Sequence, residues 1–319
     1  MRPVVSGLEE SLITGGSERG RRPSIGSAIL ARPCAMPEAA TRTLRLGHSP
    51  DPDDAFMHFA LAEGRLDTGR WRFEHRLEDI ETLNRRATRG EYEITAVSIH
   101  AYAHVSERYV LLNHGASMGE GYGPRIVARS ALDPAALRRG GGLRLAVPGE
   151  WTSAHLAAQM FLGPYDYEVV PFDRIPVAVA RGEFDAGLLI HEGQLTFQDL
   201  GLVLVADLGA WWAGETGGLP LPLGGNCIRR DLGEAIPEIS RLLRESIRYG
   251  LEHRQEAVAY ALRFGRDLDL ARTDEFIGMY VNERTLDYGD DGREAVRLFL
   301  ERAEAEGLIP RQPELEFVR

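Results

Sequence analysis

From Leu44 onward, short runs of apolar residues alternate with longer runs whose apolar positions repeat at helical spacing. This alternation is typical of β-strand and α-helix units, and it limits the fold more than any other feature of the chain. It predicts an α/β protein with a largely parallel sheet. The runs that we expect to form strands are residues 44–47, 71–77, 94–97, 109–113, 126–129, 143–147, 167–170, 186–190, 202–206 and 225–229.

Two breaks rich in glycine and proline interrupt this pattern, at residues 133–142 and 214–225. Breaks of this kind mark places where a chain passes between compact units, so we expect two lobes. A chain that crosses twice between lobes forms a hinged architecture with a ligand cleft between them. The expected lobes are lobe one, residues 43–129 and 223–319, and an inserted lobe two, residues 130–222.

Residues 1–42 are rich in Gly, Ser, Arg and Pro and lack apolar periodicity, so we expect a disordered N-terminal extension. A secretory signal needs about 7–15 uninterrupted apolar residues behind its basic end, but Arg21 and Arg22 lead only into Pro-Ser-Ile-Gly. The cysteines Cys34 and Cys227 are too few for a disulfide framework or a zinc site. These features favour a cytoplasmic protein.

Charge and residue types exclude several classes of function. The chain has 37 basic and 48 acidic residues, a net charge of −11, and no basic cluster, so we expect no nucleic-acid partner. Every basic residue is Arg, which excludes a lysine Schiff base and a Walker-type phosphate loop. With 27% charged residues the chain is too polar for a membrane bundle, so we expect no membrane partner. The expected partner is a small-molecule substrate, and the sequence allows a homodimer.

Ligands of open α/β sheets bind beyond the carboxyl ends of strands, so the residues after each strand are candidate site residues. Asp51 before Pro52, with Asp54 three residues later, predicts a helix N-cap with a capping-box-like partner. The carboxylates here lack a rigid coordinating pattern, and we expect no metal. The alternative is that Ser49 and Asp54 face a ligand.

Thr152 and Ser153 follow a Pro-Gly turn and open a run with helical apolar spacing. A helix N-terminus carries unpaired N–H groups and the positive end of the dipole, so it binds carboxylates or phosphates. Thr and Ser are also common helix caps, and capping explains both residues equally well. The two interpretations stay open.

Three histidines raise the question of catalysis or metal binding. His191 follows the apolar strand expected at 186–190, and an imidazole delivered by a buried strand is a sensible general base. A structural histidine is the alternative. His100 and His104 have a spacing that zinc could use, but no third ligand stands at a recognisable distance, so we expect them to pack on a helix.

The last third of the chain predicts amphipathic helices over residues 241–254 and 294–306, where apolar positions recur at i, i+3 and i+4. Before them, Trp211 and Trp212 lead into a Gly- and Pro-rich turn. Two adjacent indoles can stack on a flat ligand or pack in the core, and the sequence leaves both open.

The chain contains, in order, the runs HSPDPDDAFMHFAL, LEDIETLNRRA, VSIHAYAHVSERYVLL, GYGPRIVARS, VPGEWTSAH, GEFDAGLLIHEGQLTF, DLGAWWAGETGGLPLPLGG and YVNERTLDYG. Together they resemble the 1,4-dihydroxy-6-naphthoate synthase family of the futalosine route to menaquinone, over residues 43–309. The resemblance implies a two-lobe fold similar to type II periplasmic binding proteins. It also implies a cytoplasmic enzyme that uses no metal or organic cofactor.

The activity implied by the resemblance is a carbon–carbon lyase reaction that converts cyclic dehypoxanthinylfutalosine into 1,4-dihydroxy-6-naphthoate. The histidine of the Ile-His-Glu run, His191, matches the proton acceptor of the family. The implied substrate contacts are Ala96, Val97, Ser98, Thr152 and Ser153, to which we add Ser49, Asp54 and Asn226.

The first motif departs from the family form, Ser-Pro-Cys-Pro-Asn-Asp. Asp51 stands where the family has Cys, and Asp53 stands where it has Asn. Both add negative charge near a cleft for a carboxylated substrate, which costs affinity unless the carboxylates point away as helix caps.

Two other functions are compatible with the same fold. One is a non-catalytic binding protein for a small carboxylate, which would return its ligand unchanged. The other is the chorismate-dehydrating relative of the same pathway. The Ile-His-Glu and Gly-Ala-Trp-Trp runs favour the lyase over this relative.

Overall fold

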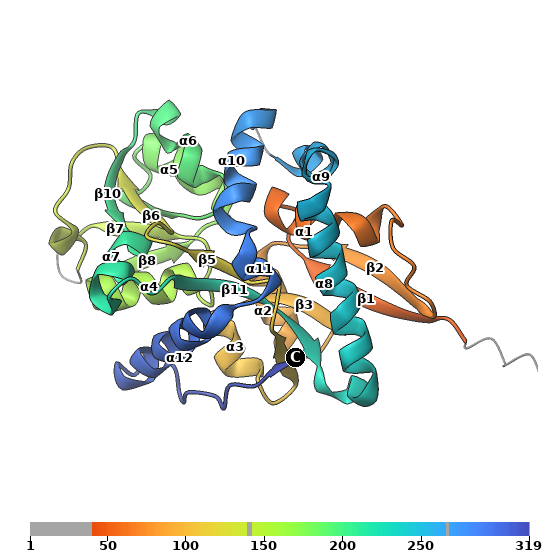
Figure 1. The fold of residues 1–319 in the computed structure, drawn as a ribbon. Helices are drawn as coiled ribbons and strands as arrows, with labels where there is room; N and C mark the ends of the chain where they lie inside the picture. The colour runs from red at the N-terminus through yellow and green to blue at the C-terminus, as the bar shows by residue number, and fades with distance from the viewer. Residues whose placement is uncertain (1–39, 139–141, 266–267, 319) are drawn as a thin grey trace, which may run out of the picture. The chain divides into compact units, whose positions relative to one another are not determined.

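The computed structural model describes residues 40–138, 142–265 and 268–318. The disordered extension expected over residues 1–42 lies outside the described residues as far as residue 39, and its last residue already begins the first strand. The described residues form helices and two separate sheets (Figure 1).

The first sheet has the strand order β12-β4-β11-β3-β1-β2, with β5 paired to β11. β1 pairs in parallel with β2 and β3, whereas β11 runs antiparallel to β3, β4 and β5. The strands are β1 (Arg42–His48), β2 (Trp71–Leu77), β3 (Ile94–Ser98), β4 (Tyr109–Leu112), β5 (Ser117–Gly119), β11 (Leu221–Arg229) and β12 (Phe317–Val318).

The second sheet has the strand order β10-β6-β9-β7-β8. β7 pairs in parallel with β8 and β9, and β6 runs antiparallel to β9 and β10. The strands are β6 (Arg125–Ala128), β7 (Arg144–Val147), β8 (Asp166–Val169), β9 (Ala186–Leu189) and β10 (Val203–Asp207).

Every strand expected from the sequence is confirmed within a few residues, but the expectation of a largely parallel sheet is wrong. Both sheets are mixed, because β6 pairs antiparallel with β9 and β11 pairs antiparallel with β3. β6 and β11 are each the first strand after the chain passes from the other sheet, so no strand–helix–strand crossover within one sheet fixes their direction as parallel. The sequence missed β5 and β12, which have 3 and 2 residues and are too short to show a period.

The chain passes from one sheet to the other slightly earlier in the sequence than the expected lobe boundaries, at both crossings. Residues 125–128, expected in lobe one, form β6 of the second sheet, and β11 of the first sheet begins at Leu221 rather than 223. The first passage lies in residues 120–124, which also carry two glycines, and not at the glycine-rich break that follows β6. The division into two hinged lobes remains our proposal, with the sheets as their frames.

Helices cover both sheets, and α1 packs against α8 and α9 beside the first one (Figure 1). Within the described ranges, none of them is long and apolar enough to cross a membrane. The helices are α1 (Pro52–Ala62), α2 (Ile80–Thr88), α3 (Ile99–Val105), α4 (Ser153–Leu162), α5 (Ile175–Ala180), α6 (Gly193–Thr196), α7 (Leu208–Thr216), α8 (Ile236–Glu252), α9 (Arg254–Ala261), α10 (Leu270–Tyr280), α11 (Glu283–Leu286) and α12 (Gly289–Ala305). Short 3-10 turns occupy Pro134–Leu137, Phe172–Arg174, Phe197–Leu200, Arg230–Ala235 and Leu262–Phe264.

The amphipathic helices expected at 241–254 and 294–306 are confirmed as α8 and α12, although both begin earlier. α8 starts at Ile236 and has Pro237 in its first turn. Proline is favourable there because N–H groups in the first turn have no partner within the helix and because its fixed φ fits the helix backbone.

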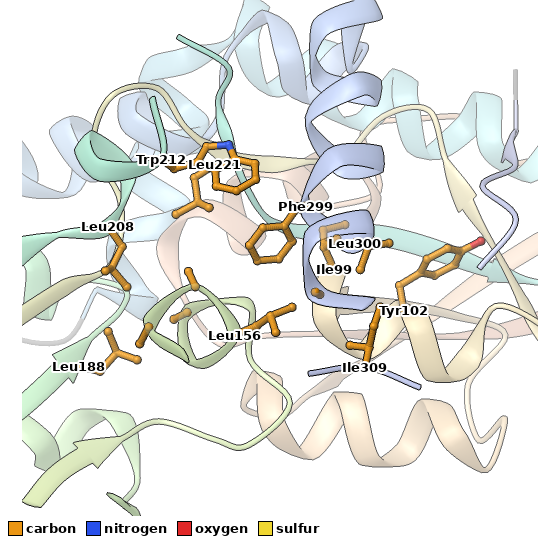
Figure 2. Packing of buried hydrophobic residues seen from close by; sticks show 14 of the residues in the cluster. Ile99, Tyr102, Leu156, Leu188, Leu208, Trp212, Leu221, Phe299, Leu300 and Ile309 are labelled. Carbon is orange, nitrogen blue, oxygen red and sulfur yellow. The ribbon is translucent and has the colours of Figure 1, made fainter. Parts of the chain in front are cut away.

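One apolar cluster joins elements of both sheets (Figure 2). Trp212 of α7 is fully buried in it, donates from Nε1 to the Pro220 carbonyl at 3.0 Å, and meets the Phe299 ring edge-on with centroids 5.4 Å apart. Trp211 packs against Phe161 at the edge of this cluster. Core packing is therefore the correct interpretation of the two indoles, and neither lines the cavity described below. Other members of the cluster are Ile99, Tyr102, Leu156, Leu188, Leu208, Leu221, Leu300 and Ile309.

Candidate functional site

A cavity of about 100 Å³ lies between elements of the two sheets. From the first sheet it is lined by the end of β3 and the middle of β11, and from the second by the start of α4 and the segment after β9. The structure brings every site residue predicted from the sequence to this cavity: Ser49, Asp54, Ala96, Val97, Ser98, Thr152, Ser153, His191 and Asn226.

The sequence reasoning did not place Gln194, Phe276 or Tyr280 at the cavity, although all three line it. The Tyr280 hydroxyl donates to Gln194 Oε1 at 3.0 Å, and burial raises the pKa of this phenol. Phe276 and Tyr280 belong to α10, and their i, i+4 spacing in the sequence looks like that of any buried helix face. No local motif could have distinguished them from core residues.

His191 follows β9 and has an unusual backbone. Its φ of 52° lies in the left-handed region, which a residue other than glycine adopts only where the surroundings hold it. Nδ1 lies 3.3 Å from Asp51 Oδ2, and the imidazole ring meets Phe172 with centroids 4.8 Å apart. Nε2 has no hydrogen-bond partner among the described residues.

The electrostatic surroundings of His191 are strongly negative. Burial lowers the pKa of its imidazole, but the nearby carboxylates, Asp51 foremost and then Asp53, raise the pKa by more, so the net shift is upward. The base candidate therefore has an apolar ring contact on one side and carboxylates on another, with one ring nitrogen left for a ligand.

Asp51 is the residue before α1, as predicted, and Pro52 takes the first helical position. The capping-box interpretation, however, is wrong. The Asp51 side chain makes no capping hydrogen bond within the described residues, and Asp54 Oδ2 instead accepts from Ser49 N at 2.7 Å and Ser49 Oγ at 2.9 Å. The Asp51 carboxylate instead lies beside the imidazole of His191. A contact between a carboxylate and an imidazolium is stronger than a hydrogen bond from a neutral backbone N–H, and this difference favours the observed position over a helix cap.

The remaining acidic residues, Asp53 and Asp54, do not point away from the cavity. Burial, and secondarily the charge of Asp54, raises the pKa of Asp53 to about 8, and its Oδ1 has no partner in the described part of the chain. Burial also raises the pKa of Asp54, while the hydrogen bonds from Ser49 oppose this shift. A protonated Asp53 thus removes much of the like-charge cost expected for this motif.

Thr152 is the N-cap of α4, since its Oγ1 accepts from His155 N at 3.1 Å. Capping is therefore confirmed for Thr152. Ser153 has a different role: its Oγ donates to the Leu223 carbonyl at 2.5 Å and accepts from His100 N at 3.2 Å. Because both residues also line the cavity, the positive end of the α4 dipole faces it.

Amide side chains complete the polar lining. Asn226 of β11 is 1% exposed, and its Nδ2 lacks a hydrogen-bond partner in the residues that the structure describes. Asn84 exchanges hydrogen bonds with Ser98, accepting from its N–H at 2.9 Å and donating to its Oγ at 3.0 Å. Asn226 is therefore a donor that a ligand can use, whereas Asn84 holds the end of β3 in place.

His100 and His104 pack as expected. The ring of His104 stacks on Trp151 with centroids 4.9 Å apart, and His100 lies against the start of α4. Over residues 40–138, 142–265 and 268–318, no group of three or more His, Cys, Asp or Glu side chains is arranged to hold a metal ion.

The sequence of this chain matches a known family and named relatives. A family model described as menaquinone biosynthesis matches residues 44–305. A relative from Thermus thermophilus, named 1,4-dihydroxy-6-naphtoate synthase, is 45% identical over 277 residues, which cover 86% of this chain and 99% of the relative.

Solved structures show the same fold. Protein AF1704 from Archaeoglobus fulgidus is 47% identical and superposes with a TM-score of 0.79, covering 84% of this chain and 98% of that one. A Candida albicans protein described as having the generic periplasmic binding protein fold is 14% identical, with a TM-score of 0.61 over 87% of this chain and 99% of its own. The binding-protein-like fold expected from the sequence is confirmed.

Proposed function

The chain belongs to the menaquinone biosynthesis family of enzymes, and from this premise we propose that it is a 1,4-dihydroxy-6-naphthoate synthase. The proposed reaction is a carbon–carbon lyase reaction on cyclic dehypoxanthinylfutalosine in the cytoplasm. The observation that carries the proposal is the imidazole of His191, which lines the cavity with Nε2 unpartnered among the described residues.

In the proposed mechanism, His191 Nε2 takes a proton from the saturated ring system of the substrate. The part derived from the cyclised ribose then fragments, and aromatisation of the remaining ring drives the step. The left-handed backbone and the contacts of the ring fix the direction of the imidazole before substrate arrives, which favours proton transfer.

Donors on the other walls suit the oxygen-rich substrate. The N-terminus of α4 offers its dipole to an anionic or polyhydroxyl end, and Asn226 Nδ2 offers a hydrogen bond. A protonated Asp53 can also donate, where an ionised carboxylate would repel the substrate carboxylate. The cavity therefore has donors for binding and one base for reaction.

The proposal is tested by incubating the purified protein with cyclic dehypoxanthinylfutalosine and following the products by mass spectrometry. We expect 1,4-dihydroxy-6-naphthoate from the wild-type protein. Recovery of unchanged substrate that nevertheless raises the melting temperature would contradict the proposal and identify a binding protein.

A further inference from the structure

The proposed function gives no role to the carboxylate of Asp51. This residue is completely buried and places Oδ2 3.3 Å from Nδ1 of His191. A buried carboxylate is costly unless an interaction compensates for it, so its surroundings indicate its role.

The helix that follows does not explain the carboxylate. Asp51 has the extended backbone of an N-cap, with φ −118° and ψ 155°, and its carbonyl accepts from Ala55 N at 2.9 Å. An aspartate at this position ordinarily caps the helix with its side chain, but within the described chain no such bond forms here. The backbone of Asp51 thus begins α1 while its side chain serves another group.

The side chain of Asp51 reaches His191. The imidazole of His191 contacts both the Asp51 carboxylate and the Phe172 ring, and the backbone of His191 is held in the left-handed region. Because Asp51 approaches Nδ1, the tautomer with a proton on Nδ1 is favoured, and Nε2 is left as the basic nitrogen. The separation of 3.3 Å is long for a hydrogen bond, and contacts of this kind tighten when substrate closes the site.

We propose that Asp51 is a positioning residue for His191, fixing its tautomer and stabilising the imidazolium that forms when Nε2 takes the proton of the substrate. The inference rests on the proposed function. It assigns this chain a carboxylate–histidine pair beside the cavity.

Three other acidic residues also lie near His191, Asp53 and Asp54 in the first turn of α1 and the adjacent Glu192, and each raises the pKa of the imidazole when it is ionised. Asp51 makes the largest of the contributions that raise the pKa of the imidazole. Removal of its charge should therefore lower this pKa, even though the other carboxylates remain. Since a base must be deprotonated, the acidic limb of the pH–rate profile should move to lower pH.

The main variant is Asp51→Asn, which keeps the shape and removes the charge. We expect kcat above the acidic limb to fall by about tenfold or more because the tautomer is no longer fixed, with KM changed by less than about threefold. The acidic limb should shift down by about one pH unit. The matched control is Asp199→Asn, which removes an exposed carboxylate that pairs with Arg272 and not with His191. It should leave the pH–rate profile unchanged.

Titration of the His191 ring by NMR separates this inference from the proposed function, because it needs no turnover. The ring signal is assigned by its loss in His191→Asn. The inference predicts a lower pKa of His191 in Asp51→Asn, and an unchanged pKa in a folded variant would overturn it even if the wild type converts substrate. Wild type that fails to convert substrate would overturn the proposed function, and this inference with it. If circular dichroism shows Asp51→Asn to be unfolded, Asp51→Cys replaces it under the same criteria.

Discussion

At the scale of single residues, the neighbouring acidic groups Asp53 and Asp54 differ in protonation. Asp54 accepts two hydrogen bonds from Ser49, which favour its ionised form. Asp53 is buried beside that charge, and its pKa is raised to about 8. At neutral pH Asp53 therefore carries a proton, and its side chain is uncharged, as an asparagine side chain would be.

Replacement of this residue tests the idea. In the wild type, Asp53 loses its proton as the pH rises through about 8, and the new charge should repel a carboxylated substrate, so KM should rise. Asp53→Asn cannot ionise and should keep KM nearly constant over the same range, with kcat/KM at pH 7 within about threefold of wild type. The measurement is KM between pH 7 and 9.5, and an equal alkaline rise in both proteins would contradict the role of Asp53.

The sequence predicted which residues meet at the cavity better than it predicted what each side chain does. Residues that follow strands gather at the carboxyl edges of the two sheets, so Ser98, Thr152 and His191 could be found from local patterns. The role of Asp51 could not, because its partner His191 is distant in the sequence. Local sequence rules predicted that the Asp51 side chain caps α1, whereas its position is set by the contact with His191.

At the scale of elements, β1, α1 and β2 contribute three histidines that lie close together: His48, His58 and His75. His48 Nε2 lies 2.9 Å from His75 Nδ1, and the rings of His48 and His58 have centroids 4.7 Å apart. Neither ring nitrogen of His58 has a partner in the described ranges. Burial lowers the pKa of His48 and His75 to about 4 and also lowers that of His58.

This cluster should make the fold sensitive to acid. The pKa of each histidine in the folded state lies below its ordinary value of 6.5, so between pH 6.5 and about 4 the unfolded chain binds more protons. Stability is then lost as the pH falls through that window. His58→Leu removes one such group without breaking a hydrogen bond to a described residue, and it should reduce the drop in melting temperature between pH 7 and 5.

Thermal unfolding at the two pH values measures the effect. His253→Leu is the control, because His253 is exposed and stacks on Tyr249 away from the cluster. We expect the control to retain the wild-type drop in melting temperature. If the melting temperature of His58→Leu falls between pH 7 and 5 by as much as that of the wild type, the cluster does not set the acid limit of stability.

The elements themselves were largely predictable, whereas their pairing was not. Buried strands such as β9 appear as apolar runs, and α8 and α12 show a helical period, so local signals were sufficient. The direction of β6 and β11 depends on partners that are far away in the sequence. No local pattern records that a strand has arrived from the other sheet.

At the scale of the described chain from residue 40 onward, contacts between the two sheet systems close the cavity. Trp151 N donates to Glu81 Oε2 at 3.0 Å, Arg85 pairs with Glu150 at 3.1 Å, and Asn84 Nδ2 donates to the Trp151 carbonyl at 3.2 Å. Separation of these contacts would widen the cavity, so the arrangement favours an opening and closing motion.

Small-angle scattering tests this motion. The hinged account predicts that the protein without ligand has a larger radius of gyration than the protein saturated with 1,4-dihydroxy-6-naphthoate. Glu81→Ala, which removes one closing contact, should enlarge the ligand-free form further. Scattering curves that superpose with and without ligand would contradict closure.

A single-turnover experiment decides whether His191 performs the chemistry in this cavity. Enzyme is mixed in excess with cyclic dehypoxanthinylfutalosine, the reaction is quenched over time, and the naphthoate is quantified by mass spectrometry for wild type and His191→Asn. We predict a rate lower by about 10² to 10⁴ in the variant, with substrate affinity measured by calorimetry nearly unchanged. Formation of naphthoate at the wild-type rate in His191→Asn would contradict the account.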